Sequence, residues 1–380
     1  MELEFLSELA VRRGPFATVY LDASHNTPDA ERRVDLSWRD ARRDLASQGA
    51  DEATLTALDK AVETAEPAVG PAGRVLVAAH GETLLDRSLP GPPLRIEARW
   101  SPLPHVMPLL AQYPDPLPYL VVVADRSGAD VSAWAGPGEQ LFADSVVGPD
   151  QYPLHKVPGG GWSALRYQHA VEVAWEHNAV AVAQEVTRVA DAVRARLVVV
   201  AGDVRARSLL MDSLPPRVAE VAVSTESGSR ADPSGLDVDS LVSARISSER
   251  SELLERLGAG YARDTAVQGL EAVVGALREG MVDTLVVVDD PSSDLTLAVG
   301  PDPLQLALRE DVLAGYGVEA RRDRADAAIV RALAASGGRL EVITYDRSPD
   351  EDLNESAEKP PVEFTDGLAA IVRRPGAGQY

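Results

Sequence analysis

Short apolar runs rich in β-branched residues alternate with longer amphipathic segments along most of this chain. The first run is FATVYLDA at residues 16–23; the amphipathic segment AERRVDLSWRDARRDLAS follows at 30–47 and the run RVLVAAH at 74–80. Compact β-branched runs predict strands, and apolar residues at three- and four-residue steps predict helices. The alternation therefore predicts an α/β protein. Its 380 residues exceed the size at which one hydrophobic core stops growing, so we expect more than one domain.

We predict three domains. Residues 1–148 form a mixed α/β N-terminal domain that ends in three strands at 118–126, 129–136 and 139–148, spaced like an antiparallel meander with Asp and Gly turns. Residues 149–260 form an α/β central domain, which opens with a loop rich in Pro and Gly and continues into a long helix. Residues 261–380 repeat the same alternation and predict a C-terminal α-β-α sandwich.

Further elements follow from the same patterns. The long helix should cover about 163–194, with an apolar stripe at Tyr167, Val171, Ala174, Val182, Val186, Val189 and Val193. The other expected strands are 196–202, 217–224, 283–290, 339–346 and 367–374, and the other expected helices are 203–214, 238–257, 266–280 and 325–338.

Composition narrows the cellular setting. The chain contains no Cys, which excludes disulfides, thiolate metal sites and Cys nucleophiles. Its start, MELEFLSELAVRRG, does not resemble a signal peptide, and no apolar run approaches the roughly 18 residues of a membrane span. We therefore expect a cytoplasmic protein without a membrane partner.

The charge balance bears on nucleic-acid binding. The formal net charge is −22, of which residues 149–260 contribute only −3. So acidic a chain should not bind DNA or RNA non-specifically, because that mode depends on a basic surface that neutralises phosphates. Any contact with RNA should be local, and the middle third is the least unfavourable place for it.

Standard catalytic motifs are missing: there is no GxxxxGK[ST], HExxH or GxSxG, and GAGYARD at 258–264 follows a helix rather than a strand. Two groups have the chemistry of metal ligands. One is His169, Glu172, Glu176 and His177 on the long helix; the other is Asp289, Asp290 and Asp294 after a strand. A solvated helix face and an exposed acidic turn account for them better. We expect no catalytic residue, no metal and no cofactor.

The segment HKVPGGGWSALR, at the start of the long helix, is the strongest candidate for a binding site. Its Trp can pack back on the domain as a staple, with Ser163 capping the helix. Equally, a helix N-terminus attracts phosphate, and an exposed Trp can stack on a base. Both interpretations remain open on the residues alone. The candidate RNA-binding residues are His155, Lys156, Gly159, Gly160, Gly161, Trp162, Ser163 and Arg166.

The string GGGWSALRYQ resembles the central domain of archaeal and eukaryotic class I translation termination factors, in which GGQ is followed by SALRF and a long helix. WEHN downstream matches a charged stretch of that family ending in His-Asn. GLEAVVGALREGMVDTLVVVDD and GGRLEVITYDRS resemble its third domain. The likeness is collinear and covers roughly 60% of the chain, which is about the share of its two predicted domains from residue 149 onward.

Two departures from the family bear on function. Trp162 stands where the family has its catalytic Gln, and an indole offers one N–H donor and no acceptor. The Asn-Ile-Lys-Ser element that reads stop codons is also missing. The resemblance therefore implies a bacterial relative of these factors, like the Balon-type hibernation factors. Such a protein would occupy the vacant A site of the 70S ribosome without releasing peptide, with elongation factor Tu as a possible companion.

Two other functions stay open. One is a hydrolase that acts on peptidyl-tRNA or RNA through His155, His169 or a metal. The other is an adaptor whose last domain recruits a GTPase.

Overall fold

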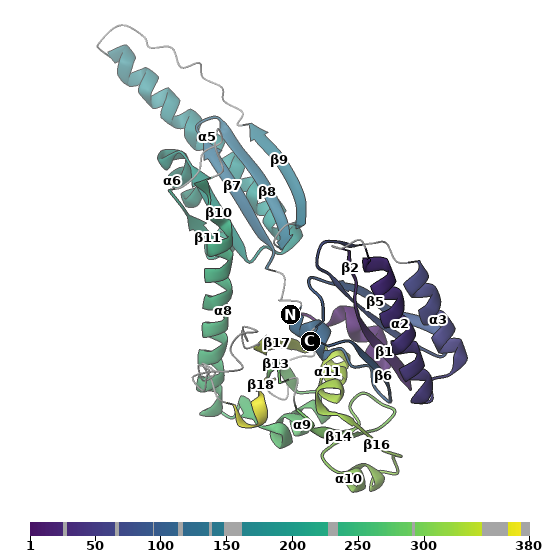
Figure 1. The fold of residues 1–380 in the computed structure, drawn as a ribbon. Helices are drawn as coiled ribbons and strands as arrows, with labels where there is room; N and C mark the ends of the chain where they lie inside the picture. Colours follow the sequence, from purple (N-terminus) through teal and green to yellow (C-terminus); the bar gives the residue numbers. More distant parts are fainter. Residues whose placement is uncertain are drawn as a thin grey trace, which may run out of the picture. The chain divides into compact units, whose positions relative to one another are not determined.

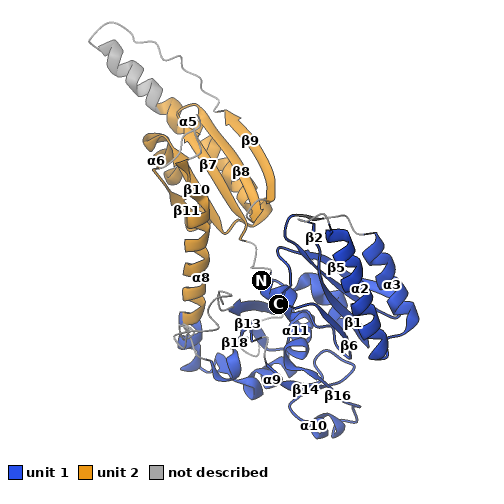
Figure 2. Cartoon of the chain, in the orientation of Figure 1, with its two compact units in different colours: residues 1–115, 255–380 blue, residues 116–254 orange. Residues whose placement is uncertain are grey.

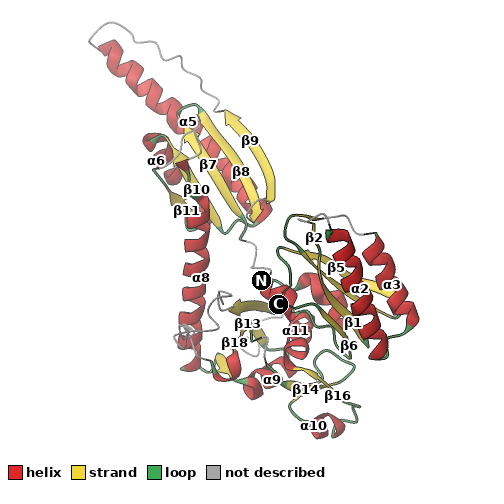
Figure 3. Cartoon of the chain, in the orientation of Figure 1, coloured by secondary structure: helices red, strands yellow, loops and turns green. Residues whose placement is uncertain are grey.

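The computed structural model describes residues 1–25, 29–64, 68–93, 95–112, 117–136, 139–147, 162–226, 235–290, 293–343 and 364–373, giving the backbone alone at 68–69 and 162–172. They form two compact units (Figure 2). Unit 1 combines residues 1–115 with 255–380, and unit 2 is residues 116–254. Both units contain helices and strands (Figure 3), so the predicted α/β class is confirmed.

Unit 2 is built on a five-stranded sheet with the order β11-β10-β7-β8-β9 (Figure 1). The strands are β7 (Tyr119–Asp125), β8 (Gly128–Gly136), β9 (Glu139–Val147), β10 (Leu197–Gly202) and β11 (Ala222–Ser224). The first three form the expected antiparallel meander. β10 runs parallel to both β7 and β11. The sheet is therefore mixed, with its parallel part made from strands far apart in the sequence.

Helices cover both faces of this sheet. They are α5 (Trp162–Val193), α6 (Val204–Ser213), α7 (Pro216–Ala219) and α8 (Val238–Tyr261). Val198 and Val200 of β10 share a core with α5 and α6, whereas Val199 packs toward Val242 of α8. The described part of the predicted α5 stripe is confirmed, because Ala174, Val182, Val186 and Val189 are buried and Val193 packs against the same core.

The N-terminal part of unit 1 is a four-stranded antiparallel sheet with the order β5-β4-β1-β6. Its strands are β1 (Phe16–Asp22), β4 (Gly73–Ala79), β5 (Glu82–Leu89) and β6 (Glu97–Ser101), and the short β2 (Ser24–His25) and β3 (Ala68–Val69) pair separately. Its helices are η1 (Glu4–Leu6), α1 (Ser7–Val11), α2 (Ala30–Ser47), α3 (Glu52–Glu63) and α4 (Met107–Gln112).

The C-terminal part of unit 1 contains two sheets, β12-β18-β13-β17 and β15-β14-β16. The strands are β12 (Ala266–Gln268), β13 (Val282–Val288), β14 (Thr296–Val299), β15 (Leu306–Ala307), β16 (Arg321–Arg324), β17 (Arg339–Ile343) and β18 (Leu368–Val372). The helices are α9 (Leu270–Arg278), α10 (Glu310–Ala314), α11 (Ala325–Ser336) and η3 (Thr365–Gly367). In the described part of the chain, no helix has both the length and the apolar character needed to cross a membrane.

Both ends of the chain contribute to one hydrophobic core in unit 1. Alternate residues of β1 face opposite sides of its sheet. Ala17, Val19 and Leu21 pack with α2 and α3, whereas Phe16 and Tyr20 share a core with α9 and α11. α11 is buried almost all round, as expected of a helix at the centre of a core.

The units differ from the predicted domain boundaries at 148 and 260. The boundary at 148 separates the β7–β9 meander from the sheet to which it belongs, because β7 pairs with β10. The boundary at 260 separates residues 261–380 from 1–115, although the two segments share a core. Both differences arise from contacts between residues far apart in the chain, which local periodicity does not reveal.

Two predicted elements are also corrected. The strand expected at 217–224 begins as the helix α7, with Pro216 in its first turn, a position that Pro favours, and only Ala222–Ser224 is a strand. The helix expected at 266–280 begins at Leu270, because Ala266–Gln268 pair with β18 and Gly269 adopts a positive φ of 86°. The glycines of GAGYARD at 258 and 260 lie in the last turn of α8.

A buried arginine joins α11 to two other segments of unit 1. The Arg331 side chain donates hydrogen bonds to the carbonyl oxygens of Ala10, Gly300 and Pro301, at 2.9, 3.0 and 2.7 Å. The residue is 6% exposed. Burial lowers the pKa of the Arg331 guanidinium. The three carbonyl oxygens accept hydrogen bonds from it and so offset the cost of burying its charge. Arg331 thus holds α1, α11 and the end of β14 together.

We expect Arg331→Met to lower the free energy of unfolding by about 3 kcal/mol, because it removes the donor to the carbonyl groups of the buried Ala10 and Gly300 and of the exposed Pro301. Urea denaturation of the full chain measures the change. Arg309→Met is the matched control, since Arg309 is an exposed arginine paired with Asp311 and should have little effect. Equal losses for the two variants would refute the role assigned to Arg331.

Candidate functional site

Most of the predicted binding residues lie outside the described residues. These are His155, Lys156, Gly159, Gly160 and Gly161. Trp162 is the first residue of α5, and Ser163 and Arg166 follow in its first two turns, where the backbone alone is described. The structure therefore shows that a helix of 32 residues begins directly after the three glycines.

A second group of polar residues lies where the parallel strands β7 and β10 end. β7 turns into β8 through the two-residue loop at 126–127. The carboxylate of Asp125 accepts hydrogen bonds from the backbone N–H groups of Ser127 and Gly128, at 2.7 and 3.0 Å, and from the Ser127 hydroxyl. The turn fixes Arg126 at the tip of the hairpin.

The neighbouring strand ends in an equally constrained way. Gly202 has a φ of +109°, and a Cβ there would lie 2.0 Å from the Ala124 carbonyl oxygen, so only glycine fits. Asp203 follows as the N-cap of α6, and its carboxylate accepts from the backbone N–H groups of Arg205 and Ala206. This cap places Arg205 in the first turn of α6.

The two arginines meet at Trp175 of α5. The guanidinium carbon of Arg126 lies 4.9 Å from the centroid of the indole ring, and that of Arg205 lies 5.6 Å from it. The buried Asn178 side chain, one turn further along α5, donates to the Arg126 carbonyl oxygen at 3.2 Å. We call Arg126, Trp175 and Arg205 the Trp175 cluster.

The Trp175 cluster combines two cations with an aromatic ring, and its cavity is too small for an organic molecule. A guanidinium stacked on an aromatic ring keeps its planar N–H edge available for carboxylate or phosphate. The cavity beneath the indole has a volume of about 20 Å³, enough for roughly one water molecule. Sequence reasoning missed this cluster because its three members are separated by long stretches of chain. The available signal was that Arg126 is the last residue of one predicted strand and Arg205 lies three residues past the end of another.

The candidate metal groups are not supported by the described geometry. Within the part of the chain that the structure describes, no three His, Asp or Glu side chains are placed to hold a metal ion. Glu176 and His177 are exposed, as are Asp290 and Asp294. The side chains of His169 and Glu172 lie outside the described residues.

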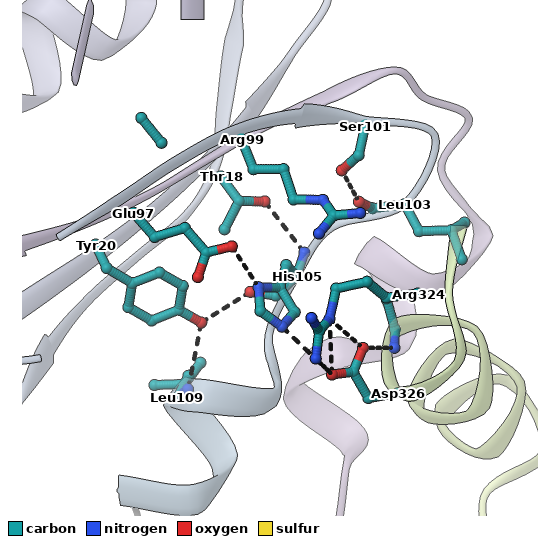
Figure 4. Close-up of polar contacts among 12 residues, drawn as sticks. Thr18, Tyr20, Glu97, Arg99, Ser101, Leu103, His105, Leu109, Arg324 and Asp326 are labelled. Carbon is teal, nitrogen blue, oxygen red and sulfur yellow. Dashed lines mark hydrogen bonds and ion pairs between the residues drawn. The ribbon is translucent and has the colours of Figure 1, made fainter. Parts of the chain in front are cut away.

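Unit 1 contains a buried network of charged groups around His105 (Figure 4). The His105 ring lies between two carboxylates: Nδ1 is 3.0 Å from Glu97 Oε1, and Nε2 is 3.5 Å from Asp326 Oδ2. Arg324 makes a bidentate contact with Asp326, donating from Nε to Oδ1 and from Nη2 to Oδ2. The Tyr20 hydroxyl donates to the His105 carbonyl oxygen at 2.8 Å.

A second ion pair reinforces the same junction. Arg99 of β6 contacts Asp323 of β16 at 2.9 Å, and Asp323 also accepts from the Leu103 backbone N–H. Asp323 is 3% exposed. The network therefore connects β1 and β6 with the corner between β16 and α11, that is, the N-terminal with the C-terminal part of unit 1.

The charges of this network depend on one another. Burial disfavours a charged imidazole, but the hydrogen bonds to Asp326 and Glu97 outweigh it and raise the pKa of His105 to about 9. Burial likewise opposes the charged carboxylates, yet His105 lowers the pKa of Glu97, and His105 with Arg324 lowers that of Asp326 strongly. These shifts favour an imidazolium held between two carboxylates at neutral pH.

The raised pKa of His105 predicts a pH dependence of stability. A group whose pKa rises from 6.5 to about 9 on folding stabilises the fold fully below pH 6.5 and loses that contribution as pH rises through 9. We expect the free energy of unfolding to fall by about 3 kcal/mol across this interval, and His105→Gln to flatten the profile there. Urea denaturation at several pH values measures both.

His80→Gln is the control for this experiment, because His80 is an exposed histidine in the same unit. A profile that keeps its slope in His105→Gln would assign the pH dependence to other groups.

Known proteins resemble this chain both over unit 2 and over most of its length. The model of bacterial archaeo-eukaryotic release factor family 2 matches residues 118–263, which include the whole Trp175 cluster. The uncharacterized protein Rv2629 of Mycobacterium tuberculosis (strain ATCC 25618 / H37Rv) is 36% identical over 351 residues, which cover 90% of this chain and 92% of the relative. The uncharacterized protein MT2704 of strain CDC 1551 / Oshkosh gives the same values.

Solved structures of termination-type factors also match, at lower similarity. The archaeal termination factor aRF1 is 16% identical, with 98% of this chain and 96% of that chain covered and a TM-score of 0.25. Dom34 of S. cerevisiae is 13% identical, with 77% and 74% covered and a TM-score of 0.37. Archaeal Pelota, in a model of its ribosome-bound form with ABCE1, is 16% identical, with 98% and 93% covered and a TM-score of 0.37.

The family match and the curated relatives confirm the resemblance that the GGGWSALRYQ segment indicates. The chain belongs to the bacterial archaeo-eukaryotic release factor family.

Proposed function

We propose that this protein is a cytoplasmic, non-enzymatic ribosome-binding factor that occupies the vacant A site of idle 70S ribosomes during stress. The observation that carries the proposal is the start of α5: a helix of 32 residues begins at Trp162, directly after the three glycines. In termination factors that position belongs to the catalytic Gln. The protein keeps the segment that reaches the peptidyl-transferase centre and lacks the amide that acts there.

The helix is suited to carry its first residues over a long distance. At 1.5 Å per residue, 32 residues span about 48 Å. Its second half is fixed to the sheet of unit 2, since Val182, Val186 and Val189 are at most 3% exposed. A helix anchored at one end positions the segment at its other end relative to the sheet.

The chemistry of the indole argues against peptide release. Positioning a water molecule at an ester requires an acceptor or a donor–acceptor pair, and the indole N–H only donates. An indole can instead stack on an exposed base, which contributes about 1–3 kcal/mol. In this proposal Trp162 contacts rRNA without taking part in a reaction.

The proposal includes elongation factor Tu as a companion that contacts residues 261–380. This segment carries a net charge of −10, which favours a protein partner over RNA. Because residues 261–380 share a core with 1–115, the interaction has to be tested with the full chain rather than with an isolated C-terminal fragment.

We expect Trp162→Ala, or deletion of residues 159–161, to weaken binding to vacant 70S ribosomes by roughly tenfold, through the loss of base stacking. Co-sedimentation and filter binding measure the affinity. Tyr316→Ala is the matched control, since Tyr316 is an aromatic residue of unit 1 that is 73% exposed.

Ribosomes with tRNA in the A site should not bind the protein, and the wild type should release no peptide from peptidyl-tRNA. Equal binding to vacant and filled ribosomes would exclude A-site occupancy. Peptide release by the purified protein would instead support the hydrolase alternative.

A further inference from the structure

We infer that the Trp175 cluster is a second RNA contact of unit 2, in which Arg126 and Arg205 bind phosphate groups of the rRNA backbone. The inference rests on the proposed ribosome binding. It concerns a site that is separate from the glycine segment: Trp175 lies 13 residues beyond Trp162 on α5, about 20 Å along the helix axis.

The first argument is the stacking of two exposed guanidinium groups on one indole. The Arg126 side chain is 51% exposed, and Arg205 is exposed as well. Trp175 is half-buried and lines the small cavity beneath its ring. Stacking restricts the long arginine side chains before any ligand arrives, so less entropy is lost when they bind a phosphate.

The second argument is that the backbone beneath both arginines is fixed. The carbonyl of Arg126 accepts from the buried Asn178, and the turn around it is closed by Asp125. Arg205 is in the first turn of α6, which Asp203 caps. The backbone positions from which the two guanidinium groups extend are therefore set by the fold.

Two nearby carboxylates are hydrogen-bonded to the turns that contain them. Asp125 accepts three hydrogen bonds within its turn, and Asp203 accepts two from the α6 backbone. The ion pair between Arg126 and Asp203 is long, at 3.4 Å, so a phosphate can compete for Arg126.

The composition of this surface favours RNA over a protein partner. A protein interface needs a core of apolar side chains within a buried area of about 1,000 Å² or more. The most exposed large apolar side chain near the Trp175 cluster is that of Val204, which is 73% exposed. A single exposed side chain does not form such an apolar core. A phosphate backbone needs only the two planar cations.

The salt dependence of ribosome binding tests the inference. The Arg126→Gln variant and the Arg205→Gln variant each lose one phosphate contact. The slope of log affinity against log salt concentration should therefore decrease in magnitude by about 0.7–0.9 per substitution. At about 0.1 M salt each variant should bind vacant 70S ribosomes roughly five- to tenfold more weakly, with the difference shrinking as salt rises.

Arg188→Gln is the matched control. Arg188 is an arginine of α5 itself: it lies 5.8 Å from the Phe142 ring and pairs with Glu185, but it is outside the cluster. It should keep the wild-type slope. Circular dichroism of each variant confirms that it folds, and a folded Arg126→Gln, Arg205→Gln double variant with the wild-type slope would overturn the inference.

A photo-crosslinker in place of Val204 identifies the bound molecule directly. Crosslinks to rRNA are the expected result, whereas crosslinks to a ribosomal protein would overturn the assignment to RNA. If the wild type fails to bind ribosomes at all, the proposed function falls and this inference with it; if only the slopes are unchanged, the inference alone falls.

Discussion

The parallel pairing of β7 with β10 determines how unit 2 is built. Parallel neighbours cannot be joined by a tight turn, so the chain between them has to cross over the sheet. Here that connection contains the rest of the meander and α5, which returns across the face made by Val122 and Val200. The same pairing brings the carboxyl ends of the two strands together. The hairpin that carries Arg126 and the cap that precedes Arg205 therefore both lie close to Trp175.

Unit 1 depends on a different constraint, the burial of charge. His105, Glu97, Asp326 and Arg324 are mutually compensated, and so are Arg99 and Asp323. Removing one member of such a set leaves its partner charged and desolvated, which costs more than the pair contributes. The network therefore selects one way of fitting the N-terminal sheet to the β16–α11 corner, while the apolar core supplies most of the stability.

Local patterns predict those elements whose residues decide their own conformation. β1, α2, α5 and α11 lie within two residues of their predicted ends, because their periodicity is strong. β11 and α9 do not, because Pro216 and the pairing of β12 with β18 override the local signal. The grouping into units and the Trp175 cluster could not be predicted, since each depends on residues that meet only after long-range pairing. The glycine segment is recognised from its resemblance to a family rather than from its physical pattern.

The shared core of unit 1 has a consequence for the order of folding. During synthesis residues 1–115 leave the ribosome before residues 116–254, but the Phe16 and Tyr20 side of their sheet is covered by α9 and α11, which are made after both. Residues 116–254 hold all the strands of their own sheet and can complete it in the meantime. An apolar surface of the nascent N-terminal segment thus stays uncovered until most of the chain has been translated. Chaperones can bind this surface for longer than they can bind the core of unit 2.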